Sequence, residues 1–117
     1  MRYAILYYDS EDEVNGRAKS HEDAVMARVT TVEKALAGTG RLVSVARLLP
    51  TTTATTVRHG RGLLIIDGPF AKTEEQLLGL YVVDCASLNE AIETAKELRY
   101  ANGSEGTYEL RPLTSNG

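Results

Sequence analysis

Cysteine is almost absent from this sequence, and its scarcity narrows the chemistry available to the protein. Cys85 is the only cysteine among 117 residues. A single thiol cannot form an intramolecular disulfide, and no Cys-x-x-Cys pair is present for metal or redox chemistry. The two histidines, His21 and His59, lie far apart without a carboxylate at ligand spacing, which predicts no metal site. We therefore expect a chain that folds without a metal, a cofactor or a disulfide, in the reducing cytoplasm.

Long apolar runs and an excess of positive charge are also missing. The opening apolar run, residues 3–8, is too short for the core of a signal peptide, and no stretch approaches the roughly 18 apolar residues of a membrane span. The net charge of −3 argues against broad nucleic-acid affinity, because neutralising phosphates requires clustered cations. We expect a soluble cytoplasmic protein that binds neither a membrane nor nucleic acid directly.

Acidic residues are missing from one central interval. None occurs between Glu33 and Asp67, whereas five basic residues fall there: Lys34, Arg41, Arg47, Arg58 and Arg61. If these arginines converge in space, they would offer a site for a small anion.

The overall composition is that of an ordinary globular chain. Hydrophobic residues make up 43% and charged residues 25%, close to average usage. A chain of this length fits one domain with one core, so we expect a single domain over residues 1–117.

Hydrophobic periodicity and turn signals predict the order strand, helix, strand, hairpin, strand, helix, strand. The predicted elements are a strand at 3–8, a loop at 9–19, a helix from about 21 to 38 capped by Ser20, a strand at 42–49, a hairpin with strands at 56–58 and 63–66, a strand at 77–84, a helix capped by Ser87 and ended by Asn102, and a strand at 107–113. This order is typical of an α+β, ferredoxin-like split βαβ fold with an extra β-hairpin.

Two of the predicted strands, at 3–8 and 77–84, are apolar on both faces. Two helices can cover only one face of the sheet, so the other face needs a cover. We expect a second copy of the chain to supply it, giving a homodimer packed sheet to sheet.

The most distinctive segment is Asp67-Gly68-Pro69-Phe70, which follows an apolar strand. Asp67 can bond forward to turn backbone, Gly68 tolerates unusual dihedral angles and Pro69 fixes the exit of the chain. The turn would hold a carboxylate and the aromatic ring of Phe70 at a strand end, where pockets often form. Alternatively, Asp67 only caps its own turn.

The wider pattern resembles the YCII-related family, whose members are called DGPF-domain proteins. The resemblance is carried by Asp67-Gly68-Pro69-Phe70-Ala71-Lys72-Thr73-Glu74-Glu75-Gln76 with Gly79 and Tyr81, by the opening Met-Arg-Tyr-x-x-Leu-Tyr-Tyr, by residues 54–58, by Ser87-Leu88-Asn89-Glu90-Ala91 and by Glu109-Leu110-Arg111-Pro112. It implies a dimeric α+β barrel. Family members often carry a helix histidine in a His-Asp pair, but residues 26–30 contain none, and His21 could replace it only by pointing into the cleft.

Two interpretations of function follow, and the sequence leaves enzyme or non-enzyme open. In the first, the protein binds a small anionic metabolite beside Asp67, which would serve as acid or base. Arg58 or Arg111 would hold the anion unless each is used in a salt bridge, and Tyr7 would orient the ligand unless it only packs in the core. Gly68, Pro69 and Phe70 would line the site.

The second interpretation is a non-enzymatic accessory or regulatory dimer. It rests on the resemblance, because members of the family often accompany extracytoplasmic-function sigma factors and some are fused to them. No basic recognition helix is visible, so an association with a sigma factor is expected rather than contact with DNA.

Overall fold

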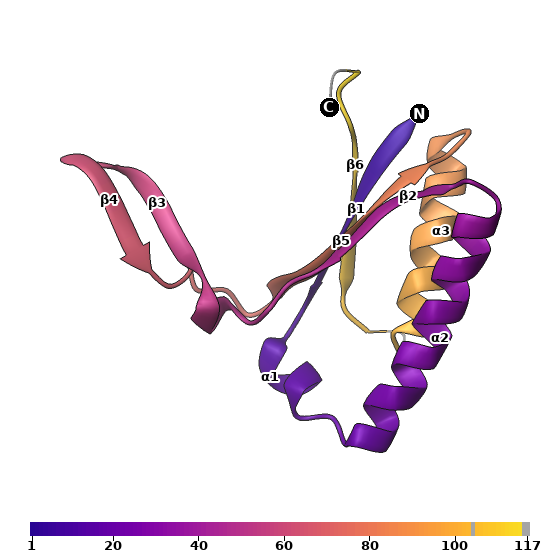
Figure 1. Ribbon diagram of the computed structural model, residues 1–117, viewed down its shortest axis with the longest axis horizontal. Coiled ribbons are helices and arrows are strands. Elements are labelled where there is room, and N and C mark those ends of the chain that lie inside the picture. The colour runs from indigo at the N-terminus through magenta and orange to yellow at the C-terminus, as the bar shows by residue number, and fades with distance from the viewer. Residues whose placement is uncertain (104, 116–117) are drawn as a thin grey trace.

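A computed structural model describes residues 1–103 and 105–115 of the chain (Figure 1). The elements are β1 Arg2–Asp9, α1 Glu11–Asn15, α2 Lys19–Gly38, β2 Leu42–Arg47, the 3₁₀ turn η1 Thr51–Thr53, β3 Thr55–Gly60, β4 Gly62–Asp67, β5 Gln76–Asp84, α3 Leu88–Ala101 and β6 Thr107–Pro112.

Four of the strands form one antiparallel sheet in the order β2-β5-β1-β6, and β3 pairs only with β4 in a second sheet. β1 lies in the middle, paired with β5 on one side and β6 on the other. This arrangement confirms the predicted split βαβ, ferredoxin-like pattern with an inserted hairpin.

The core lies between the four-stranded sheet and the two long helices, α2 and α3, which cover one face of it (Figure 1). Alternate residues of a strand point to the same face. On β1 the residues facing the helices are buried, and Ile5 is fully buried. Leu98 of α3, which is fully buried, meets this layer, whereas Val25 of α2, with 1% exposure, packs with Val29 and with Ala101 of α3. The apolar residues of α2 and α3 thus lie on the sides of the helices that are buried in the core.

The opposite face of the sheet carries apolar side chains that none of the described helices covers (Figure 1). Ala4 and Leu6 of β1 lie beside Val82 and Leu80 of β5, and all four are half-buried. We refer to this surface as the open face. The expectation that two helices cover only one face is therefore confirmed, whereas the dimer stays a prediction.

The β3–β4 hairpin, residues 55–67, projects away from the rest of the molecule (Figure 1). We call it the arm. Val57, Leu63 and Ile65 share one of its faces and are 60%, 70% and 69% exposed. The radius of gyration, 15.9 Å, exceeds the about 13 Å expected for a compact domain of this length. The arm thus lies outside the core of its own chain.

Two local features differ from the sequence-based expectation. The predicted loop at 9–19 contains the helix α1, whose N-cap Ser10 accepts a hydrogen bond from the Glu13 amide. The next helix begins at Lys19 after Ala18, so Ser20 lies inside its first turn instead of capping it. Cap residues mark where a helix can begin, but the tertiary path of the chain selects among them.

A bulge interrupts the pairing of β5 with β1. Tyr7 pairs with Gly79 and Tyr8 with Leu77, which leaves Leu78 as an extra residue. Bulges bend a strand and re-aim a side chain. Here the bulge turns Leu78 toward the helices, where it lines the cavity described below.

Candidate functional site

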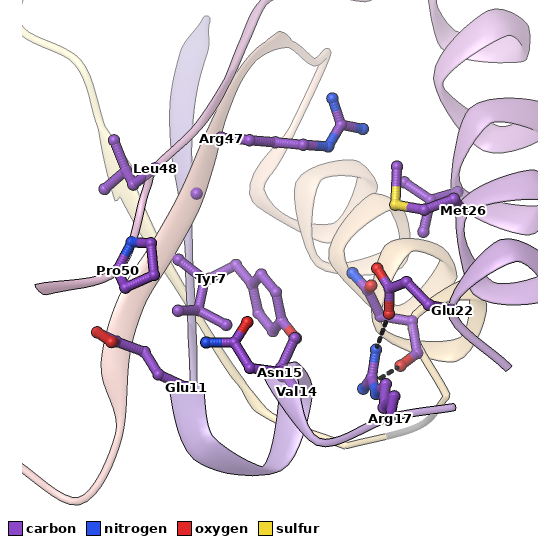
Figure 2. Close-up of a pocket in the computed structure, with 14 residues that line it drawn as sticks. Tyr7, Glu11, Val14, Asn15, Arg17, Glu22, Met26, Arg47, Leu48 and Pro50 are labelled. Carbon is purple, nitrogen blue, oxygen red and sulfur yellow. Dashed lines mark hydrogen bonds and ion pairs between the residues drawn. The ribbon is translucent and has the colours of Figure 1, made fainter. Parts of the chain in front are cut away.

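A cavity of about 220 Å³ lies between β1, α1, the first half of α2 and the segment that follows β2 (Figure 2). We call it the Tyr7 cavity, after the buried residue on its wall. Its polar lining comes mainly from Tyr7, Asn15, Arg17, Glu22 and Asn102, and its apolar lining from Val14, Met26, Val29, Leu48, Pro50 and Leu78.

A buried carboxylate stands directly behind Tyr7. Asp9, with 5% exposure, is the last residue of β1 and points to the same face as Tyr7. Its Oδ2 accepts the Tyr7 hydroxyl hydrogen at 3.1 Å, and its Oδ1 accepts the Ser10 amide at 2.8 Å. Burial, and secondarily the charge of Asp9, raises the pKa of Tyr7 above its ordinary value. The phenol is therefore protonated at neutral pH and donates to Asp9.

A second tyrosine supports the first. The rings of Tyr7 and Tyr108 stack with centroids 4.8 Å apart. The Tyr108 hydroxyl accepts a hydrogen bond of 2.6 Å from the Asn102 side-chain amide, and burial raises its pKa to about 12. Stacking and hydrogen bonding fix the Tyr7 ring in one orientation against the cavity. The position of its oxygen is thus set by β1, β6 and the end of α3 together.

Arg17 lies on the short connection between α1 and α2 and brings a largely buried cation to the cavity. Its Nη1 pairs with Glu22 Oε2 at 3.4 Å, and its Nη2 donates to the Asn102 carbonyl at 3.4 Å (Figure 2). The side chain is 14% exposed. The guanidinium has five N–H donors, so these two bonds leave others available to a ligand.

Arg47 supplies a second guanidinium at the opposite end of the cavity (Figure 2). Its Nη2 lies 2.6 Å from Glu33 Oε2, and this hydrogen bond raises the pKa of Arg47. Between the two arginines the apolar wall is built by α2 on one side and by Leu48, Pro50 and the bulge residue Leu78 on the other. The cavity is thus apolar along its length and charged near its ends.

The helix α1 is fastened to the base of the arm. Both carboxylate oxygens of Glu11 accept the Thr51 amide, at 3.0 and 3.1 Å, and the Glu11 amide donates to the Gln76 side chain at 2.9 Å. Thr51 begins η1, four residues before the arm. The wall that α1 gives to the Tyr7 cavity is therefore held by contacts far away in the sequence.

A second, polar cavity of about 330 Å³ adjoins the same connection. Arg17 and Val14 line both cavities. Asp9 and His21 both line this second space. His21 therefore shares a cavity with a buried carboxylate, although it is exposed at the start of α2.

The Asp-Gly-Pro-Phe turn lies at the root of the arm, away from the Tyr7 cavity. Asp67 is exposed and pairs with Thr55. The Gly68 amide donates to the Ala54 carbonyl at 2.7 Å, and the Thr56 hydroxyl donates to the Gly68 carbonyl at 2.7 Å. Gly68 has φ of 123°, which favours glycine. The turn is thus hydrogen-bonded to the residues at the start of the hairpin.

Pro69 and Phe70 line an apolar groove of about 560 Å³ at the arm root, which shares the wall residues Leu48 and Pro50 with the Tyr7 cavity. Phe70 is 75% exposed. Other walls of this groove come from Tyr8, Leu49 and Leu77. The groove opens near the open face, so this part of the Asp-Gly-Pro-Phe turn belongs to the outer surface of the chain.

The two predicted anion-holding arginines lie apart from each other. Arg58 is exposed on the arm, opposite Leu64 of β4. Arg111 is exposed on β6, opposite Ala4 and hence on the open face. Of the predicted site residues, the structure places Tyr7 in the Tyr7 cavity and distributes the others over the arm, its root and the open face. Their roles stay predictions.

Sequence reasoning missed Asp9, Arg17, Glu22 and Asn102. Asp9 continued the alternation of Tyr3, Ile5 and Tyr7, a signal that its polar character hid. The other three come from a connection, a helix start and a helix end. Only the tertiary fold brings these three residues together, and no local sequence pattern predicts their proximity.

Among residues 1–103 and 105–115, no three His, Cys, Asp or Glu side chains are grouped so that they could hold a metal ion. Within the same part of the chain, no helix combines the length and the apolar character needed to cross a membrane.

Comparison with known proteins places the whole chain in one group. The family model described as the YCII-related domain matches residues 1–115. An uncharacterised protein of Rhizobium meliloti (strain 1021) is 47% identical over 114 residues, which cover 97% of this chain and 92% of that protein. Both findings confirm the resemblance drawn from the sequence motifs. The chain belongs to the YCII-related family.

Proposed function

We propose that this protein binds a small organic metabolite in the Tyr7 cavity. The observation that carries the proposal is the Tyr7–Asp9 pair, a buried carboxylate and phenol beside a cavity with an apolar wall. A few convergent polar groups in a mostly apolar pocket are typical of ligand sites. The volume of about 220 Å³ suits a small metabolite.

The same pair offers a route for acid–base chemistry. A ligand hydroxyl bound to the Tyr7 oxygen can pass its proton to that oxygen while the Tyr7 proton moves to Asp9 Oδ2. The ligand then carries the negative charge, the Asp9 carboxylate becomes neutral and Tyr7 ends as a neutral phenol. Arg17, whose positive charge acts on Tyr7, would stabilise the new anion. In this proposal Asp9 takes the acid–base role that the sequence suggested for Asp67.

Binding is tested by filling the cavity. Val14 of α1 lines it and Asp12, on the same short helix, is exposed. A thermal-shift screen of small organic acids, amines and alcohols should raise the midpoint of the wild-type protein, because a ligand that binds only the folded state stabilises it. Val14→Trp should abolish that shift and Asp12→Trp should keep it. A shift that survives Val14→Trp would place the ligand elsewhere.

We also propose that the working form is a homodimer. The open face carries Leu6 and Leu80, and the arm carries Leu63 and Ile65, all without a cover from the described chain. An isolated two-stranded hairpin is marginal in water, so the arm gains most from a second surface. Size-exclusion chromatography with light scattering at micromolar concentration should show twice the chain mass. A single monomeric species would contradict the proposal, and a complex with a sigma factor would favour the accessory role.

A further inference from the structure

The hydrogen-bond directions inside the Tyr7 cavity restrict the chemistry of its ligand. Tyr7 has one hydroxyl hydrogen, and Asp9 Oδ2 receives it. Toward the cavity the Tyr7 oxygen therefore presents lone pairs, which accept a hydrogen bond. The Tyr7 oxygen can therefore accept a hydrogen bond from a donor on the ligand, such as a hydroxyl or an amino group.

Arg17 has the opposite requirement. Its guanidinium is a donor only, and its bonds to Glu22 and to the Asn102 carbonyl, both 3.4 Å, are long. A carboxylate accepts from guanidinium in a parallel pair of bonds and makes a shorter, charge-assisted contact. Arg17 and Tyr7 line the same cavity and are linked through Asn102, whose carbonyl accepts from Arg17 and whose side-chain amide bonds Tyr108, the ring stacked on Tyr7. The acceptor and donor groups of the ligand are therefore also neighbours.

The remaining lining is apolar. Met26 of α2 faces Leu48 and Pro50 across the space (Figure 2), and Val29 and Leu78 also line it. A ligand that fills the cavity buries a short hydrocarbon or aromatic body against these residues, which contributes binding free energy in proportion to the apolar area removed from water.

We infer that the ligand is a small carboxylic acid with a compact apolar body and a hydroxyl or amino group next to its carboxylate. The carboxylate binds Arg17, the hydroxyl or amino hydrogen donates to the Tyr7 oxygen, and the body packs between α2 and the Leu48–Leu78 wall. This inference rests on the proposed binding function and specifies the substrate class of the same cavity.

Two matched series of probes test the inference by NMR titration of the wild-type protein. The aromatic series is mandelate, phenylglycine and phenylacetate; the aliphatic series is α-hydroxyisocaproate, leucine and isocaproate. Within each series the last compound lacks only the hydroxyl or amino group. In at least one series the substituted acid should bind about tenfold or more tightly than the plain acid, because a site that pairs with a ligand donor rejects the analogue without it.

Tyr7→Phe should remove that preference, bringing the substituted and plain acids within about threefold of each other, since the accepting oxygen is gone. Tyr8→Phe is the matched control, because Tyr8 is the next residue of β1 and points to the open face. It should leave the preference unchanged. If Tyr7→Phe does not fold, Arg17→Gln tests the other half: it should weaken every acid about tenfold or more and leave the binding of benzyl alcohol unchanged.

The outcomes separate the two proposals. If plain acids bind as tightly as substituted acids in both series, or if none of the six acids binds while amines or alcohols from the thermal-shift screen do, the ligand class is wrong and the binding function stands. If no compound of any class binds the wild-type protein, the binding function itself is contradicted. A preference that persists in Tyr7→Phe would overturn the assignment of the donor to Tyr7.

Discussion

The helix-covered sheet and the arm both contain apolar strands, but only the sheet buries the apolar side chains of its strands. Leu98 in the covered region is fully buried, whereas Leu63 on the arm is 70% exposed. Both regions have regular hydrogen-bonded pairing, and yet only the first has a core. The difference teaches that apolar strands in one chain can serve two ends: the sheet stabilises the fold, and the arm leaves an apolar surface exposed, which we propose takes part in association.

The comparison is tested most directly by one substitution made in both regions. Leu98→Ala should lower the free energy of unfolding by about 2–5 kcal/mol, because it leaves a cavity in the core. Leu63→Ala should change it by less than about 0.5 kcal/mol in dilute protein, because the side chain is exposed. Urea unfolding followed by circular dichroism measures both. Equal losses would mean that the arm packs on its own chain.

Glycines with positive φ give a second matched pair. Gly106 has φ of 83° and Gly62, at the arm tip, has φ of 77°. A Cβ on Gly106 would lie 2.7 Å from Tyr7 Cε1 and 2.9 Å from the Tyr8 carbonyl oxygen, whereas nothing stands within 4 Å of one on Gly62. Gly106→Ala should therefore cost about 2–3 kcal/mol of stability, and Gly62→Ala about 1 kcal/mol or less. Similar midpoints of urea unfolding for the two variants would mean that a Cβ at Gly106 does not disturb the packing of Tyr7.

Association should depend on one face of the arm. Ile65→Asp places a charge on the face that also carries Val57 and Leu63, and it should weaken the dimer by about 2 kcal/mol or more, roughly thirtyfold in dissociation constant. Arg58→Asp introduces the same side chain on the other face and should have a smaller effect. Sedimentation equilibrium measures both constants. An unchanged dimer in Ile65→Asp would show that the open face alone holds it.

The smallest expected effect is a loss of stability at alkaline pH that comes from the buried tyrosines of the covered region. Burial raises the pKa of Tyr7, Tyr81 and Tyr108, the last to about 12. The folded state then holds the phenolic protons more tightly, so their contribution is complete below pH about 10, the ordinary tyrosine value, and declines as pH rises through the folded pKa values. Urea midpoints should therefore fall at pH values above about 10, and Tyr108→Phe should reduce the slope. The arm contains no tyrosine and should not contribute to this pH dependence. If the urea midpoint still falls as steeply with pH after the buried tyrosines are replaced by phenylalanine, another group causes the loss.

Much of the fold was readable from the sequence because local signals agreed. Apolar residues on both faces of segment 3–8 predicted a central strand, and Ser87 marked the start of α3, where its hydroxyl accepts the Glu90 amide at 3.1 Å. The hairpin was predicted from glycines around Arg61, and it forms with Gly60 opposite Gly62. These features depend on neighbours within a few residues, which is the range that periodicity and capping report.

The direction of the arm and the composition of the site depend on distant contacts. Residues 63–66 were predicted as the returning strand of the hairpin, but an apolar run does not show whether its side chains will be covered. Asp9 was assigned to a loop although it completes the buried face of β1, since a polar residue after an apolar strand usually marks its end. Asn102 was read only as a helix terminator, and yet its side chain supports Tyr108 and its carbonyl receives Arg17.

The bulge at Leu78 separates the shape of the cavity from the pairing of the strands. Leu78 lies outside the regular pairing of β5 with β1, while its carbonyl still accepts the Leu48 amide at 2.9 Å. A substitution there reshapes the apolar wall of the Tyr7 cavity and leaves the ladder of the sheet intact. A change at this one residue therefore alters the shape of the cavity without a change in the strand pairing.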